Sequence, residues 1–359
     1  MFHDLTSFSK AFKDAIQSGN PAIGLVADND LDGLFSAVKL DLALYDLLEL
    51  EVETVFRDEL RWEIPITDQF DVLIFLDLAY DNTPNYRKAA ASARNTFAID
   101  HHVTSERGFP QRVEAFNPCK EGQCYQPTTF LVDRINKKLG QKDNALQDYL
   151  TILGVLADAG INFKVSSEEM LTFEFAFDEA LQTVFNLSQT RFKELLAAVK
   201  YKEWIYPRFK EINAALNSSA KDLGWKEIYF RFINQAEDVN AASKLVEEIE
   251  KKYSNAYKEL LDQVPKEPTG KTSSGIWIFK NNTPIPNGTI GRIIAEMYGE
   301  AVISYSCKKF CRVSARAPVG MDMDFIPLFA GYGGGHPKAS GAILTPKRFD
   351  EFLEKARNY

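Results

Sequence analysis

Three short apolar runs, each followed at once by an aspartate, constrain the fold of this 359-residue chain more than any other feature. The runs and their aspartates are 22–27 with Asp28, 72–76 with Asp77, and 96–99 with Asp100. Continuous apolar runs of this length are typical of strands that a parallel sheet buries on both faces. A helical pattern over 33–48 and an alternating segment over 51–56 follow the first run. The sequence therefore predicts a doubly wound parallel α/β sheet.

The middle of the chain has a different pattern. Hydrophobic residues make up 45% of the sequence and charged residues 26%, which indicates a globular chain with material for two domains. Helical patterns rich in Glu, Lys, Phe and Leu, such as 190–200 and 241–261, replace the α/β alternation there, and the clearest loop follows at 265–275. We predict three parts: a catalytic domain at 1–165, a helical connector at 166–268 and a smaller α/β domain at 269–359.

The last part again mixes strand and helix patterns. We expect strands at 276–279, 301–305 and 310–315, a helix at 289–298, and a final helix from about Pro346. The glycine-rich segment before the final helix is, taken alone, typical of a flexible turn.

The strongest chemical signal is the segment that follows the first strand, which places Asp28, Asp30 and Asp32 directly before Gly33. Alternate residues of an extended segment point to one side, and clustered carboxylates need a hard divalent cation among them. A calcium loop of the EF-hand type opens in the same way, but its twelfth position, which needs a glutamate, is Lys39 here. A solvated acidic turn without a ligand is the remaining alternative for this segment alone.

The later strands add acidic and imidazole groups to the same predicted edge. The carboxyl ends of the strands form the ligand crevice of a doubly wound sheet, so Asp77, Asp100, His101 and His102 are expected to join the first cluster. Asp158 follows an apolar helical stretch, where a carboxylate opposes the helix dipole, so we expect it to serve a function there.

These motifs, in this order, resemble those of the DHH phosphoesterases. The matching features are the Asp-x-Asp-Gly segment, the lone Asp77, the triplet Asp100-His101-His102, and Asp158 in Leu-Ala-Asp-Ala-Gly. The resemblance continues near the carboxyl end of the chain, where the family's DHHA1 domain carries a GGGH signature and an S-x-R strand. The residues that match these two motifs are Gly333, Gly334, Gly335, His336, Ser314 and Arg316.

The resemblance implies a centre of two divalent ions, Mn²⁺ or in its place Mg²⁺. One ion would be held by Asp28, Asp30 and Asp77, and the other by Asp32, Asp77, His101 and Asp158, with Asp77 as the bridge. His102 would face the scissile phosphate, and Asp100 would orient the two histidines. Many members of the family have a histidine where this chain has Asp28, so the affinity and identity of the first ion are open. The Asp28 position and the Asp-x-Asp-Gly ending are similar to the RecJ-like branch.

The last domain would then select the substrate. Arg316 offers a planar donor pair for phosphate, and the backbone N–H groups of the three glycines can approach phosphate closely. His336 would add a donor. Arg292, on the expected helix, is a further candidate, and its alternative interpretation is an ordinary solvated helix charge.

The resulting hypothesis is a phosphodiesterase, an exonuclease or oligonucleotidase that releases nucleoside monophosphates from single-stranded or short nucleic acids. One alternative is a phosphatase of small molecules, such as bisphosphorylated nucleosides, cyclic dinucleotides or polyphosphate. Another is a DHH scaffold without catalysis. The net charge of −8 argues against broad coating of duplex nucleic acid, but not against a nucleotide held at one site.

Location and assembly are less constrained. The first residues do not have the pattern of a secretory signal, and no apolar run approaches a membrane span, so we expect a cytoplasmic protein without a membrane partner. The pairs Cys119/Cys124 and Cys307/Cys311 fit zinc spacing poorly, which favours reduced thiols. The oligomeric state stays open.

Overall fold

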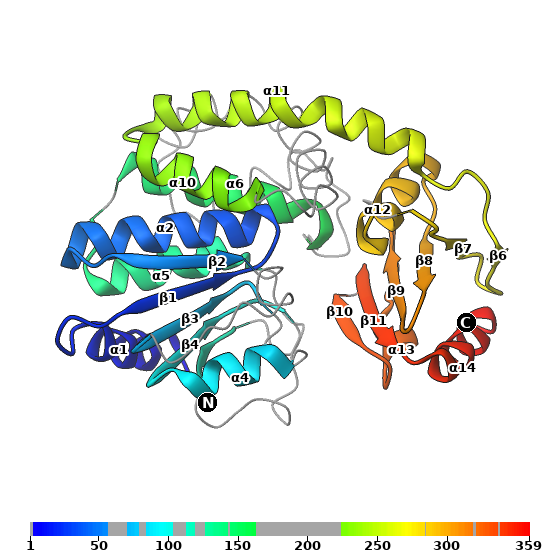
Figure 1. Cartoon of the computed structure of the whole chain (residues 1–359), viewed down its shortest axis with the longest axis horizontal. Coiled ribbons are helices and arrows are strands. Elements are labelled where there is room, and N and C mark those ends of the chain that lie inside the picture. Colours follow the sequence, from blue (N-terminus) through cyan, green and yellow to red (C-terminus); the bar gives the residue numbers. More distant parts are fainter. Residues whose placement is uncertain are drawn as a thin grey trace. The chain divides into compact units, whose positions relative to one another are not determined.

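The computed structural model describes residues 3–56, 70–78, 84–102, 113–118, 126–142, 144–162, 224–283, 285–318, 321–336 and 338–359. The predicted helix at 190–200 lies outside these residues, and so do Cys119 and Cys124. The described residues form two compact units that meet in sequence between Lys251 and Lys252, within the long helix α11 (Val239–Gln263). Each unit is described by itself (Figure 1). The predicted boundaries at 165 and 268 stay predictions.

The first unit contains a five-stranded parallel sheet in the order β2-β1-β3-β4-β5. The strands are β1 (Ile23–Ala27), β2 (Val52–Phe56), β3 (Val72–Leu76), β4 (Asn95–Ile99) and β5 (Val113–Phe116). Every residue of β1 and β3 is buried, as expected for strands covered on both faces. The predicted fold class is confirmed. Four strands match the sequence pattern closely, whereas β5 was not predicted.

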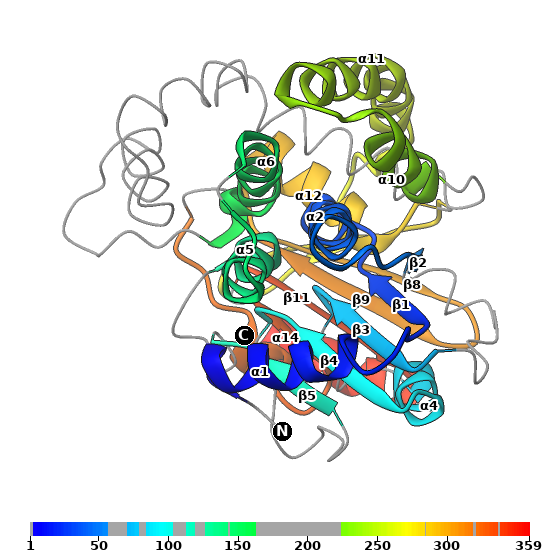
Figure 2. The same cartoon turned by 90° about the vertical axis from the view of Figure 1, so that its left-hand side faces the viewer.

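Helices cover both faces of this sheet (Figure 2). α4 (Pro84–Ser92) buries Ala89 and Ala90 in a core with Leu73, Phe75 and Ala98 on one face. α1 (Leu5–Ile16), α2 (Leu31–Leu48) and α5 (Thr128–Leu139) cover the other face. The Phe12 ring of α1 packs edge-on against the Phe97 ring of β4, with the two ring centroids 5.1 Å apart.

α2 is the central helix of the first unit. It packs against α5, α6 (Ala145–Asn162) and α10 (Gly224–Gln235). The Lys39 ammonium, fully buried, lies 2.9 Å from an Asp133 carboxylate oxygen and donates to the Gln147 carbonyl, which joins α2 to α5 and α6. The Tyr229 hydroxyl donates to Asp41, which joins α10 to α2, and burial raises the pKa of Asp41 to about 6. The described part of the predicted connector is thus helical.

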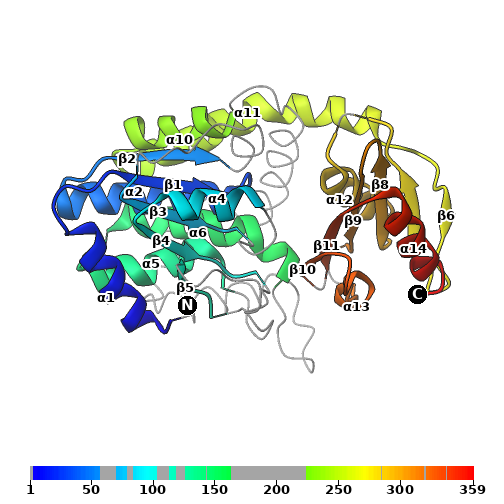
Figure 3. The ribbon, with the colours of Figure 1, turned by 60° about the horizontal axis from the view of Figure 1, so that its bottom comes forward.

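The second unit is built on a six-stranded mixed sheet in the order β10-β11-β9-β8-β7-β6. Its strands are β6 (Gly270–Lys271), β7 (Trp277–Lys280), β8 (Val302–Cys307), β9 (Cys311–Arg316), β10 (Gly334–His336) and β11 (Ala339–Leu344). α12 (Asn287–Tyr298) covers one face, and α13 (Ile326–Phe329) and α14 (Pro346–Arg357) cover the other (Figures 1 and 3).

One local prediction for this unit was wrong. The loop expected at 265–275 contains the short edge strand β6, which pairs antiparallel with β7. The glycine-rich segment is not only a turn, because its second half forms β10, which pairs antiparallel with β11. Both short strands form because their backbone N–H and C=O groups pair with a neighbouring strand, and the sequence pattern does not show which strand that neighbour is.

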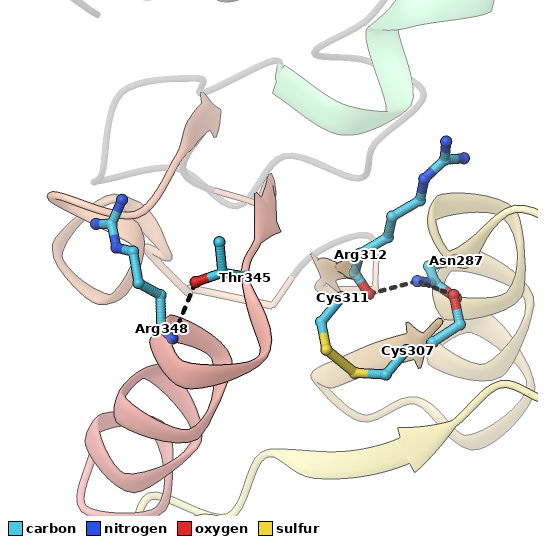
Figure 4. Close-up of a disulfide and its surroundings, with 7 residues drawn as sticks. Asn287, Cys307, Cys311, Arg312, Thr345 and Arg348 are labelled. Carbon is cyan, nitrogen blue, oxygen red and sulfur yellow. Dashed lines mark hydrogen bonds between the residues drawn. A yellow bond between two sulfur atoms is a disulfide. The ribbon is translucent and has the colours of Figure 1, made fainter. Parts of the chain in front are cut away.

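The prediction of reduced thiols was also wrong for one pair. Cys307 and Cys311 face each other directly across the β8–β9 hairpin and form a disulfide (Figure 4). Cys311 is buried in the core of the second unit, whereas Cys307 is exposed. Among the described helices, none has the length and apolar content that a membrane crossing needs. A cytoplasmic location stays a prediction.

Candidate metal centre and phosphate-binding site

Three aspartates lie at one edge of the parallel sheet, because three neighbouring strands end in register. Asp28 donates its backbone N–H to the Leu76 carbonyl at 3.1 Å, and Asp77 donates to the Ile99 carbonyl at 3.0 Å. Asp100 continues the series with a bond to β5. The hydrogen bonding between neighbouring strands therefore extends to each aspartate. Because β1, β3 and β4 are neighbours in the sheet, Asp28, Asp77 and Asp100 follow one another in this order along its edge.

Asp77 is the centre of this edge. Its side chain is almost fully buried, and its ligand atoms lie within 4.8 Å of those of Asp28 and Asp30 in one group and of those of His101 and His102 in another. The Asp77 Oδ1 is 3.1 Å from the His101 Nε2. Asp77 also has a positive φ of 61°, an uncommon conformation for a residue with a side chain. Strained backbone of this kind is frequent at functional sites.

The start of α2 carries the other two carboxylates of the acidic segment. Asp30 is the N-cap residue of α2 and accepts the Gly33 N–H at 2.9 Å. Gly33 is required by close packing, because a Cβ there would lie 2.6 Å from the backbone oxygen of Asp28. The glycine of the Asp-x-Asp-Gly segment thus lets the helix begin directly against the acidic loop.

The structure places Asp32 differently from Asp28 and Asp30. Its Oδ2 accepts the Thr128 N–H at 2.7 Å, and its Oδ1 accepts the Thr129 N–H at 2.9 Å and the Thr129 hydroxyl. These three hydrogen bonds occupy about three of the four lone-pair positions of the Asp32 carboxylate. Two of them satisfy the backbone N–H groups at the start of α5, which have no partner within the helix. Asp32 is in neither group around Asp77 among the described residues. Its assignment as a metal ligand stays a prediction.

Thr128 is a residue of this site that the sequence did not reveal. It is fully buried, its backbone binds Asp32, and its hydroxyl donates to the Asp77 Oδ1 at 3.0 Å. A hydrogen-bond donor in this place fixes the orientation of the central carboxylate. A Thr-Thr pair at the start of a helix is too common a pattern to have indicated this role.

Replacing Thr128 by valine is expected to lower the affinity for Mn²⁺ by about 10- to 100-fold, the usual effect of removing a hydrogen bond to a ligand. The two side chains have nearly the same shape, so the fold should change little. Calorimetric titration with Mn²⁺ measures the effect. Thr151→Val is the matched control, since Thr151 is equally buried but its hydroxyl donates to a helix carbonyl. Equal affinity in both variants would show that the Thr128 bond does not orient Asp77.

The two predicted catalytic residues contact each other. The Asp100 Oδ1 accepts the backbone N–H of His102 and lies 2.7 Å from the His102 Nδ1. Asn117 donates its side-chain amide to the His102 carbonyl at 2.8 Å. Asp100 is buried, whereas the His102 side chain is 21% exposed. The histidine that was expected to meet substrate is therefore accessible and held at one ring nitrogen.

Asp158 lies in α6, which extends beyond it to Asn162. The placement of its side chain lies outside the described residues. Its role as a ligand stays a prediction.

In the second unit, the structure brings Ser314 and Arg316 together. Both side chains lie beside the first turn of α12, since a Cβ on Gly288 would be 2.9 Å from an Arg316 Nη2 and 3.6 Å from the Ser314 Oγ. Within the part of the chain that the structure describes, the buried Arg316 Nε has no hydrogen-bond partner. Burial and the nearby Arg292 guanidinium lower the pKa of Arg316. Two cationic groups close together, one with an unused donor, form a site that favours an anion.

The GGGH segment lies on the same sheet. β10 carries Gly334, Gly335 and His336, and the register places His336 opposite Ala339, which in turn lies opposite Arg316. Gly333 precedes β10. The segment is thus two strands from Arg316 at the same end of the sheet. The placement of the His336 side chain lies outside the described residues.

Comparison with known proteins gives a fold but no sequence family. The sequence matches no protein-family model and no curated protein. The structure of RecJ in complex with Mn²⁺ from Thermus thermophilus is similar with a TM-score of 0.61 and 17% identity, over 98% of this chain and 54% of that one. This chain therefore spans about half the length of that RecJ.

Two further solved structures match over most of both chains. An exonuclease RecJ bound to manganese has a TM-score of 0.55 and 16% identity, over 99% of this chain and 94% of that one. The DHH domain of a protein that belongs to a family of ribosomal proteins has a TM-score of 0.59 and 15% identity, over 97% and 87%. This chain therefore has the fold of RecJ and of DHH-domain proteins, which confirms the resemblance that its motifs indicated.

Proposed function

We propose that this chain is a metal-dependent phosphodiesterase that releases nucleoside monophosphates from single-stranded or short nucleic acids. The observation that carries the proposal is the buried Asp77 carboxylate, which belongs both to a group with two aspartates and to a group with two histidines. A buried carboxylate among other acids is costly unless cations share the site.

The donor set fits two hard divalent ions. Asp28, Asp30 and Asp77 would hold one ion, and Asp77 and His101, with Asp32 and Asp158, would hold the other. Oxygen donors with one imidazole suit Mn²⁺ or Mg²⁺ and not a thiolate-seeking metal. When bound, such a pair of ions generates a hydroxide nucleophile near neutral pH and stabilises the charge that develops on the phosphoryl group.

The protein side chains would orient the reacting groups. Asp100 fixes the His102 ring through Nδ1, and we assign to His102 the contact with the scissile phosphate. Thr128 holds the Asp77 carboxylate in one orientation. In the second unit, Arg316, Ser314 and Arg292 would bind a phosphate of the substrate, and the backbone of the GGGH segment would add N–H donors.

Turnover of a defined panel of substrates tests the proposal. Protein loaded with Mn²⁺ is expected to release mononucleotides from linear labelled single strands and from short oligonucleotides, as seen by chromatography. Bisphosphorylated nucleosides, cyclic dinucleotides and polyphosphate are the comparison substrates. Hydrolysis of these small molecules alone would establish the small-molecule phosphatase instead, and no turnover of any substrate would favour the scaffold.

We further propose that the enzyme recognises a strand end, because the Arg316 and Arg292 pair of the second unit offers two cationic groups to a terminal phosphate. Linear strands should then be degraded and circular single strands of the same sequence should persist. Equal rates on both would contradict end recognition without affecting the phosphodiesterase assignment.

A further inference from the structure

The β8–β9 hairpin concentrates positive charge on an acidic protein. Residues 301–321 contain no aspartate or glutamate, although the whole chain has a net charge of −8. The same segment contains four cationic residues, namely Lys308, Lys309, Arg312 and Arg316. Such a local excess creates a site for a polyanion that the overall charge would otherwise repel.

Arg312 lies on the same face of β9 as the phosphate-binding residues. Positions i, i+2 and i+4 of a strand share a face, so Arg312, Ser314 and Arg316 follow one another on one face at a spacing of about 7 Å. α12 covers this face at Ser314, which is buried, whereas Arg312 lies beyond that cover. The strand turns its other face, with Cys311, toward the core. Asn287, at the start of α12, donates to the Arg312 carbonyl at 2.6 Å, and the Arg312 side chain points away from the disulfide (Figure 4). The Arg312 side chain is exposed.

The hairpin tip adds an aromatic ring to the end of this row. Phe310 is 50% exposed, and the Lys309 ammonium lies 6.0 Å from the centre of its ring. Directly below the tip, the disulfide joins Cys307 to Cys311, and the Lys308 N–H donates to the Phe310 carbonyl at 3.1 Å. The aromatic ring is therefore carried on a short, cross-linked turn.

We propose that this hairpin is a second binding site for single-stranded polynucleotide, on the same strand as the phosphate site at Arg316. Arg312, about 14 Å along the strand from Arg316, would bind a phosphate that is not adjacent to the one at Arg316. The two lysines would bind phosphates further along, and Phe310 would stack on a base. This inference rests on the proposed function and names its substrate as a strand of several nucleotides.

The distance from the hairpin tip to Arg316 favours a strand of several nucleotides over a dinucleotide. From Cys311 to Arg316 the strand β9 rises about 17 Å, and Phe310 lies beyond its start, so the two ends are further apart than a dinucleotide can span with both ends in contact. Exposed aromatic rings beside cationic side chains are the usual components of surfaces that bind single strands, because every base has a face on which to stack.

Binding without hydrolysis tests the inference. Fluorescence anisotropy with the full chain in EDTA measures affinity for a labelled strand of about ten nucleotides, and competition measures the affinity for a dinucleotide. Phe310→Ala and Arg312→Gln are each expected to weaken binding of the longer strand by about 5- to 100-fold and to reduce the preference for it over the dinucleotide. Arg312→Gln should also lower the slope of log affinity against log salt by about one.

Both controls are matched in exposure, and the phenylalanine control is also matched in residue type. Phe230→Ala removes a phenylalanine of α10 that is 48% exposed, and Lys347→Gln removes an exposed charge of α14. Both should bind as the unchanged chain does. If the hairpin variants bind like these controls, or lose affinity for dinucleotide and longer strand equally, the hairpin is not a binding site of this kind.

Binding and hydrolysis, measured on the same variants, distinguish a failure of this inference from a failure of the proposed function. A chain that binds strands through the hairpin but hydrolyses none would retain the second site and lose the phosphodiesterase assignment. A chain that hydrolyses strands with no effect of the hairpin variants on affinity would do the opposite.

Discussion

Replacing Asp77 by asparagine is expected to abolish turnover and to remove high-affinity binding of Mn²⁺. Among the described residues, Asp77 is the one that belongs to both groups of potential ligands, and asparagine keeps its size while removing the charge. A metal that acts as a Lewis acid contributes several kcal/mol, and about 1.4 kcal/mol corresponds to a tenfold change in rate. We therefore expect kcat to fall by about a thousandfold or more, measured on whichever phosphoester the unchanged enzyme hydrolyses best, with Mn²⁺ binding followed by calorimetry.

Asp71→Asn is the matched control for this variant. Asp71 stands just before the same strand, at the opposite end from Asp77, and it is exposed and accepts the Ala22 N–H at 3.0 Å. Asparagine keeps an acceptor there, so turnover and Mn²⁺ binding should be unchanged. Full turnover of the Asp77 variant would mean that the metal centre is elsewhere and that the proposed mechanism is wrong.

Replacing Gly154 by alanine is expected to destabilise the first unit by about 3 kcal/mol or more, the upper range for overpacking a core. Gly154 lies inside α6, where alanine alone would gain about 1 kcal/mol, but its added Cβ would be 2.1 Å from the Thr129 Oγ1 and 2.5 Å from the Thr129 Cβ. Thr129 cannot yield easily, because it is fully buried and its hydroxyl contacts both Asp32 and Ser36. Urea denaturation followed by circular dichroism measures the loss.

The control for the glycine substitution is Gly270→Ala in the edge strand β6. Gly270 is exposed, and no atom of the described residues beyond its chain neighbours lies within 4 Å of the position of an added Cβ. Its denaturation midpoint should be close to that of the unchanged chain. A Gly154 variant with the same midpoint would show that α5 and α6 do not approach each other as closely as described.

The fold of the first unit could be predicted because its signals are local. The strands β1 and β3 are buried on both faces, so their sequences are uninterrupted apolar runs with an aspartate at the end. The aspartates then follow from topology, since parallel strands in register deliver their carboxyl ends to one edge. For Asp28, Asp77, His101 and His102 this reasoning was enough to predict that they lie together.

The contacts that depend on distant residues could not be predicted. Thr128 bonds to Asp77 and Asp32 across 51 and 96 positions of the sequence, and a threonine carries no mark of such partners. Cys307 and Cys311 are only four positions apart, but their spacing indicated neither a metal site nor a bond. Only the register of β8 on β9 places them opposite each other. The strand β10 in the glycine-rich segment was not predicted either, because glycine gives no side-chain pattern from which a strand can be recognised.

The disulfide of the β8–β9 hairpin has a practical consequence for work on this protein. The oxidised and reduced forms of the protein are two chemical species that differ by two hydrogen atoms, on the sulfurs of Cys307 and Cys311. Any comparison between laboratories, or between variants of the turn, is meaningful only when free sulfhydryl content has been titrated in each sample beforehand.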